Sequence, residues 1–154
     1  MDIKIAFTDI DGTLLNSERE VSEMLKEQVA RITEQNVPFI LISSRMPRAM
    51  THIQKDLNIE NLPIICYNGG LVLVDGEVVD DISIAPTILE DILDINKDGK
   101  FHISLYNHDD WYVPEMDFWA KREENNTKVT PIVKPTKEVI DLWIREEKGA
   151  HKVM

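Results

Sequence analysis

The stretch IKIAFTDIDGTLL, residues 3–15, decides the fold. It begins as an apolar run typical of a β-strand, which is followed by two aspartates, a glycine and a threonine. Because side chains alternate across a strand, Asp9 and Asp11 should leave it on the same side. Gly12 then allows the backbone to turn. Two carboxylates this close require a cation or a shared proton, and a hard, oxygen-seeking ion such as Mg2+ suits them.

Composition narrows the class of protein. The chain has 154 residues, 43% of them hydrophobic, which favours a globular fold over disorder. A formal charge of -11 disfavours nucleic acid and anionic membranes as partners. The single cysteine, Cys66, excludes an internal disulfide. The sequence shows neither a signal peptide nor an apolar segment of roughly 20 residues, so we expect a cytoplasmic protein.

The next segments predict a strand, helix and strand unit. A helix capped by Ser17 or Ser22 and ending at Asn36 is predicted by the helical spacing of its apolar positions, which are Val21, Met24, Leu25, Val29 and Ile32. Residues 37–42 form a continuous apolar run, typical of a parallel strand buried on both faces. Ligands bind beyond the carboxyl ends of such strands, so Ser43 should lie beside Asp9 and Asp11.

A second helix and a third strand should follow. Pro47 suits a first helical turn, and Met50, Ile53 and Leu57 share one face, which predicts core packing. Residues 63–67 predict a short strand in which Cys66 is an inert buried thiol. Asp75-Gly76 predicts the turn of a β-hairpin over residues 71–79.

The pattern of predicted helices and strands changes beyond Asp81, where we expect an α+β region. The predicted elements are a helix over 86–95, strands over 101–106 and 111–113, a helix over 114–125, a helix over 137–147 capped by Thr136, and a last apolar piece over 151–154.

The segment Asp9-Ile10-Asp11-Gly12-Thr13-Leu14-Leu15 resembles the first motif of the haloacid dehalogenase-like (HAD) phosphohydrolases. The resemblance implies that Asp9 is the nucleophile that attacks phosphorus and that Asp11 is the general acid/base. It also implies that the Asp9 carboxylate and the Asp11 backbone carbonyl hold Mg2+. Ser43 matches the second motif of the family, which holds a phosphoryl oxygen.

Further residues near these motifs are candidates for substrate binding. The stretch Asn68-Gly69-Gly70 is similar to one found in the Cof-type subgroup, whose caps are of the C2 kind. The implied substrate-binding set is Gly12, Thr13, Ser43, Ser44, Arg45 and Asn68. For Arg45 and Asn68, a structural salt bridge and a left-handed turn are equally good interpretations.

The resemblance implies an α/β fold with a Rossmann-like parallel-sheet core. We expect residues 1–81 to be the N-terminal part of a HAD core and residues 82–154 to be the beginning of an α+β C2-type cap. The expected activity is Mg2+-dependent hydrolysis of a small phosphorylated metabolite, such as a sugar phosphate, through an aspartyl-phosphate.

Two later motifs of the family have no convincing counterpart, namely a lysine and an acidic pair. Lys148-Gly149 resembles the lysine motif only superficially, because no strand and helix follow to place it. We therefore expect an incomplete and poorly active form of the enzyme. Uncovered core surfaces should also favour self-association.

Calcium binding is the alternative function. Asp94, Asn96, Asp98 and Gly99 form half of a calcium loop, but its twelfth position is Leu105, which lacks a carboxylate, so a turn is the simpler interpretation. An EF-hand at Asp9 is rejected because its sixth position would be Leu14 instead of glycine.

Overall fold

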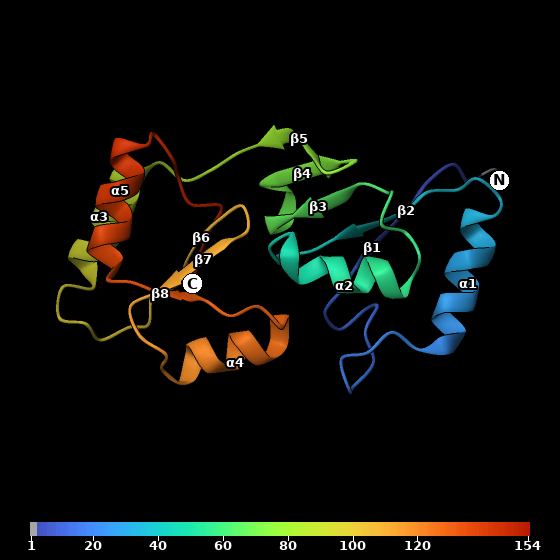
Figure 1. Cartoon of the computed structure of the whole chain (residues 1–154), viewed down its shortest axis with the longest axis horizontal. Coiled ribbons are helices and arrows are strands. Elements are labelled where there is room, and N and C mark those ends of the chain that lie inside the picture. Colours follow the sequence, from blue (N-terminus) through green and yellow to red (C-terminus); the bar gives the residue numbers. More distant parts are fainter. Residues whose placement is uncertain (1–2) are drawn as a thin grey trace. The chain divides into compact units, whose positions relative to one another are not determined.

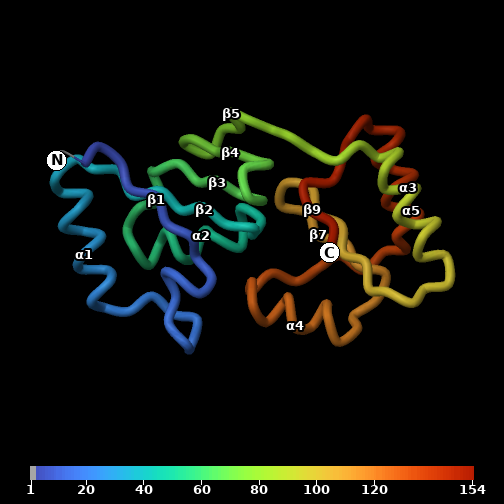
Figure 2. Tube along the Cα trace, turned by 180° about the vertical axis from the view of Figure 1, so that it is seen from behind, coloured from blue at the N-terminus to red at the C-terminus, as the bar shows by residue number. Residues whose placement is uncertain are grey.

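The computed structural model describes residues 3–154 and divides into two compact units. Unit 1 ends at Asp81, and unit 2 is Ile82–Met154. Among the described residues, no helix has both the length and the apolar character needed to cross a membrane. Each unit carries its own sheet and helices (Figures 1 and 2).

Unit 1 is built on a five-stranded sheet in the order β1-β2-β3-β4-β5. The first three strands are parallel, and β4 and β5 are added antiparallel to β3. The strands are β1 (Ala6–Asp9), β2 (Phe39–Ile42), β3 (Ile64–Cys66), β4 (Leu71–Val74) and β5 (Glu77–Asp81). The parallel part, with its helical crossovers, confirms the predicted α/β class.

Helices α1 (Glu23–Thr33) and α2 (Arg48–Asp56) are the crossovers of unit 1. The Ser22 hydroxyl caps α1 by accepting the Leu25 amide at 3.3 Å. Met24, one of the apolar positions, is 71% exposed, and the predicted end of the helix is wrong. The helix ends at Thr33, and Asn36 takes a positive φ of 58° in the turn that follows.

The core of unit 1 lies around β2 and α2. Met50, Ile53 and Leu57 are buried as predicted from their spacing, together with three residues of β2. Cys66 is also fully buried, and its thiol lies 3.5 Å from the Met50 sulfur. The interpretation of Cys66 as a buried thiol is therefore confirmed. Burial of this apolar surface stabilises the sheet and so holds the carboxyl ends of β1 and β2 in place.

The hairpin of β4 and β5 forms where the sequence predicted it. Asp75 and Gly76 both have positive φ, 52° and 79°, as the tight turn of such a hairpin requires. Every residue of β5 is exposed. At the opposite edge of the sheet, Phe7 of β1 is 52% exposed, and Ile3 and Ile5, which precede the strand, are 64% and 46% exposed.

Unit 2 has a four-stranded sheet in the order β8-β7-β6-β9. Its elements are α3 (Pro86–Ile95), β6 (Leu105–Asn107), β7 (Asp110–Val113), α4 (Phe118–Thr127), β8 (Ile132–Val133), α5 (Thr136–Arg145) and β9 (Lys152–Val153). Helices α3 and α5 lie side by side (Figures 1 and 2). A core cluster forms between them and β6: Leu89, Ile103, Leu105, Val139, Ile140, Trp143 and Ala150.

Several boundaries in unit 2 differ from the prediction, among them the end of α5, which lies at Arg145 instead of Glu147. The strand expected over 101–106 is shorter and begins at Leu105. The helix expected from Pro114 begins at Phe118, because the Asp117 carboxylate caps it by accepting the Ala120 amide at 2.8 Å. Thr136 is the first residue of α5 and not its cap; the cap position belongs to Pro135. In contrast, α3 has the predicted bounds.

Candidate active site

The carboxyl ends of the parallel strands bring the motif residues of unit 1 to one edge of the sheet. Asp9, the last residue of β1, pairs in register with Ile42, the last residue of β2. The Ser43 amide donates to the Ile65 carbonyl at 2.9 Å, which extends the pairing of β2 with β3 by one residue. Asp9 and Ser43 therefore end neighbouring strands at the same edge.

The loop after β1 directs both aspartates to solvent. Ile10 is fully buried, while Asp9 and Asp11 on either side of it are exposed. The amides of Leu14 and Leu15 both donate to the Ile10 carbonyl at 3.1 Å, which closes the turn. A positive φ of 80° at Gly12 makes this turn possible. One buried side chain thus separates two exposed carboxylates.

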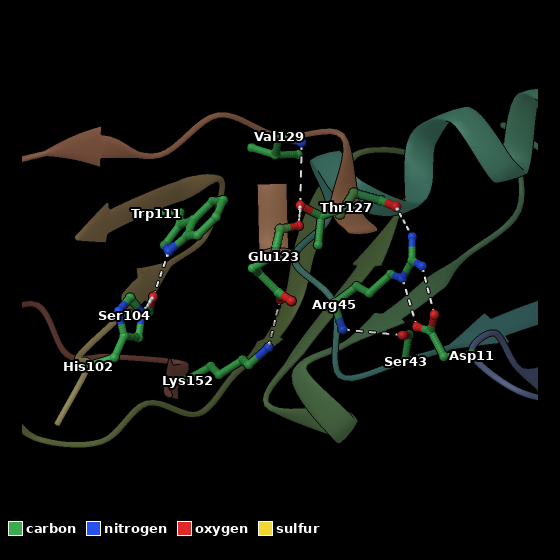
Figure 3. A network of polar contacts seen from close by, with 11 residues as sticks. Asp11, Ser43, Arg45, His102, Ser104, Trp111, Glu123, Thr127, Val129 and Lys152 are labelled. Atoms are coloured by element: carbon green, nitrogen blue, oxygen red, sulfur yellow. Dashed lines mark hydrogen bonds and ion pairs between the residues drawn. The ribbon is translucent and has the colours of Figure 1, made fainter. Parts of the chain in front are cut away.

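Arg45 binds the second of these carboxylates through two parallel hydrogen bonds. Its Nε donates to Asp11 Oδ2 and its Nη2 to Asp11 Oδ1, both at 2.8 Å (Figure 3). Its Nη1 donates to the Ala49 carbonyl at 3.2 Å. The Arg45 side chain is 5% exposed, and that of Asp11 is 47% exposed. A buried guanidinium therefore fixes the orientation of a carboxylate that still reaches solvent.

Ser43 and Asn68 belong to two loops that are tied together. The Ser43 hydroxyl accepts the Arg45 amide at 3.2 Å (Figure 3), and the Ser43 carbonyl accepts the Asn68 amide at 2.9 Å. The Tyr67 amide donates to the Arg45 carbonyl. Asn68 has a φ of 57°, so it forms the left-handed turn that the sequence left open. Ser43 is 2% exposed, and the exposed Asn68 side chain lies outside this buried linkage.

Asp9, Thr13 and Ser44 stand apart from this network. All three are exposed, and none has a side-chain hydrogen bond or ion pair with any residue in the range 3–154. The Asp9 carboxylate is therefore available to an incoming ligand, whereas the Asp11 carboxylate is held. Availability of this kind is what a nucleophile requires.

The donors at this edge suit a hard cation in type but are few. Carboxylate and carbonyl oxygens are the ligands that Mg2+ prefers, and it keeps several waters when protein ligands are few. Within residues 3–154, neither Asp9 nor Asp11 joins a group of three or more acidic, histidine or cysteine ligands. The Asp11 carboxylate among these donors is already bound to Arg45.

Two other candidates have local roles. The Asn96 side chain both accepts from the Phe101 amide and donates to its carbonyl, at 2.9 and 2.8 Å, so it closes a turn. Asp98 pairs with Lys100 in the same loop at 3.1 Å. Lys148 is exposed and pairs with Glu146 at 2.8 Å. These contacts agree with the simpler interpretation of the loop and with the rejection of Lys148 as a family motif.

The sequence analysis missed two networks. It did not pair Arg45 with Asp11, because no local pattern links side chains 34 residues apart. It also missed a network in unit 2, in which His102 contacts Asp117 at 2.8 Å and Ser104 at 2.7 Å. Trp111 Nε1 donates to the same Ser104 hydroxyl at 3.0 Å (Figure 3). The helix cap at Asp117 was the signal that could have located this second network.

Comparison with known proteins identifies the family. The model of the haloacid dehalogenase-like hydrolase family matches residues 6–154, so the chain belongs to that family, as its first motif predicted. A curated Haemophilus influenzae protein named "Putative phosphatase" is 29% identical over 135 residues, covering 84% of this chain and 50% of the relative. The chain thus spans about half the length of that relative.

Solved structures share the fold. TM0651 from Thermotoga maritima superposes with a TM-score of 0.80 at 24% identity, covering 99% of this chain and 55% of that one. BT4131, described as a sugar phosphatase of HAD subclass IIB, has a TM-score of 0.77 at 18% identity and covers 96% of this chain and 56% of its own. These similarities establish the α/β fold.

Proposed function

We propose that this chain is the N-terminal part of a Mg2+-dependent phosphatase of the Cof-type subgroup that forms an aspartyl-phosphate on Asp9. The observation that carries the proposal is the pairing of one free and one held carboxylate, Asp9 and Asp11, at the carboxyl edge of the sheet. Unit 1 is then the first part of the HAD core, and unit 2 is the beginning of its cap.

Each carboxylate has a separate role in this proposal. An oxygen of Asp9 attacks phosphorus while the bond from phosphorus to the leaving oxygen breaks, and Asp11 gives that oxygen a proton. Water then attacks the phosphorus of the aspartyl-phosphate, Asp11 accepts a proton, and phosphate leaves. Bound Mg2+ would offset the negative charge shared by Asp9 and the phosphoryl group.

Arg45 acts here as a positioning residue. Its paired hydrogen bonds hold the Asp11 carboxylate, so the ion pair must loosen and Asp11 must take up a proton from water before it can protonate the leaving oxygen. The phosphoryl group supplies competing negative charge for the Arg45 guanidinium. Ser43, Ser44, Thr13, Gly12 and Asn68 remain the proposed phosphate-binding residues at this edge.

The proposed substrate is a small phosphorylated metabolite such as a sugar phosphate. The family membership and the description of BT4131 as a sugar phosphatase support this class. We propose that residues 1–154 alone bind Mg2+ weakly and turn over slowly, because two oxygen donors and one arginine form only part of a charge-stabilising site.

Replacement of Asp9 in the full-length gene product tests the mechanism. Asp9→Asn should abolish Mg2+-dependent phosphate release from a panel of phosphomonoesters, because an amide cannot act as the nucleophile. The control, Asp75→Asn, alters an exposed hairpin turn and should leave release unchanged. Phosphate release by Asp9→Asn at the wild-type rate would rule the mechanism out.

We also propose that the chain self-associates through the open edge of β1, where Phe7 is 52% exposed. Phe7→Ser should shift sedimentation towards the monomer. Val79→Ser, at a position 59% exposed on β5, is the matched control and should not. A wild-type chain that sediments as a monomer at all concentrations would contradict this proposal.

A further inference from the structure

Unit 2 contains a cavity of about 550 Å³ that the proposed chemistry at Asp9 does not use. Its wall includes one face of α4, since Trp119, Arg122, Glu123 and Asn126 are spaced at helical intervals. The other lining residues are Lys100, Phe101, His102 and Met154. The volume is in the range of sites for small molecules.

The charge of the lining favours an anion. The Arg122 guanidinium lies over the Trp119 ring, 5.7 Å from its centre. It has no hydrogen bond or ion pair with any other residue in the range 3–154. The lining residue Glu123 is paired with Lys152 at 3.4 Å (Figure 3), and the lining residue Lys100 is paired with Asp98 at 3.1 Å. A stacked guanidinium is held in place yet keeps its donors for a carboxylate or phosphate.

Aromatic rings at the cavity offer a surface for a flat group. Phe101 is 67% exposed and Trp119 is 50% exposed, so both rings keep apolar surface in contact with water. Trp111 and Trp143 in the same unit are almost completely buried. A ring-bearing ligand that covered Phe101 and Trp119 would remove apolar surface from water.

The polar groups around the cavity are oriented before any ligand binds. His102 is held through both ring nitrogens, by Asp117 and by Ser104. Asn126 is partly buried, and its side-chain amide makes no hydrogen bond with the described part of the chain, residues 3–154. It can therefore offer both a donor and an acceptor to a ligand. A fixed wall with one free amide suits a ligand with polar ring atoms.

We propose that this cavity, lined by Arg122, Trp119, Phe101 and Asn126, binds a small anion that bears a flat heterocyclic ring. The anionic group pairs with Arg122, because Lys100 is paired with Asp98, and the ring packs on the exposed aromatic side chains. The proposal does not depend on the chemistry proposed at Asp9, and occupation of the cavity requires no reaction.

Calorimetry with adenosine monophosphate as the probe tests this site in the chain as it stands. The dissociation constant should be below about 1 mM at low salt. Adenosine lacks the phosphate and ribose 5-phosphate lacks the ring, so each should bind about tenfold more weakly. Arg122→Gln should weaken binding of the monophosphate about tenfold. Lys121→Gln removes the same charge from the neighbouring exposed position of α4 and should leave affinity within about twofold.

A fluorescence measurement reports on the same site. The monophosphate should quench the emission of Trp119 in the wild-type chain, and Trp119→Phe should lose that quenching while it retains binding. Absence of measurable binding overturns the proposal, as does equal weakening by Arg122→Gln and Lys121→Gln. Loss of binding in Asp9→Asn would place the anion at the aspartates and would also overturn it, whereas failure of the phosphatase mechanism alone would leave it intact.

Discussion

Each unit contains an aspartate that contacts a basic side chain, Asp11 with Arg45 in unit 1 and Asp117 with His102 in unit 2. The two networks differ in which group remains exposed to solvent. In unit 1, Arg45 is buried and the Asp11 carboxylate that it holds is 47% exposed. In unit 2, Asp117 holds His102, which contacts Ser104, and the Ser104 hydroxyl is fully buried. The first network ends at the surface, and the second ends in the core.

This difference decides which network can perform chemistry. Ser104, His102 and Asp117 are connected in the same order as a hydrolytic serine, histidine and aspartate triad. However, the Ser104 hydroxyl also accepts the Trp111 indole hydrogen and has no access to solvent. The order of contacts therefore does not define an active site. A reacting atom must also be reachable and free of competing partners.

The largest expected effect is on the surface network. Arg45→Met in the full-length gene product should lower phosphate release about a hundredfold, or about 2.7 kcal/mol in activation free energy, because it removes both the Asp11 partner and a charge near the phosphoryl group. Arg45→Lys should recover only part of this rate, since an ammonium group cannot make the paired contact. Steady-state kinetics would measure both. Full activity in Arg45→Met would mean that Asp11 needs no positioning.

The buried network should respond in stability instead of rate. Ser104→Ala leaves the buried His102 and Trp111 nitrogens without their shared partner, which should cost about 2 kcal/mol of unfolding free energy. Urea unfolding of the chain measures this cost, with Ser17→Ala at an exposed position as the control. In the full-length protein, the rate at Asp9 should be unchanged wherever the variant is folded. A fall in rate without loss of stability would give Ser104 a chemical role.

The smallest effect concerns pH. Partial burial acts in the opposite direction, but hydrogen bonds from the Ala120 amide and from His102 lower the pKa of Asp117 below its ordinary value of 3.8. A depressed pKa in the folded state contributes stability above the unfolded value, and this contribution is lost as pH falls through the folded value. Between about pH 5 and about pH 3, the wild type should therefore lose slightly more stability than Asp117→Asn. Equal losses in acid titrations of unfolding free energy would contradict the assignment.

The sequence predicted the features that depend on neighbouring residues. Alternation across β1 predicted the two exposed aspartates around Ile10, helical spacing predicted the buried face of α2, and the Asp75-Gly76 pair predicted a hairpin. Each of these depends on local backbone geometry or on a periodic pattern.

Features that depend on distant partners could not be predicted in this way. The start of α4 is set by Asp117, whose second oxygen is bound by His102 from another part of the chain. Met24 is exposed because no other element covers its side of α1. Helical spacing alone does not specify which side of a helix is covered. The same limitation applied to the pairing of Arg45 with Asp11.

The two edges of the sheet in unit 1 differ in chemistry. The β5 edge carries three exposed carboxylates, Glu77, Asp80 and Asp81, beside exposed Val78 and Val79. The β1 edge presents exposed Ile5 and Phe7. Like charges repel an approaching strand at the β5 edge, which disfavours strand addition there more than at the β1 edge. If two copies joined through β1, as proposed above, they would form a closed pair, and the acidic β5 edges would oppose further extension of the sheet.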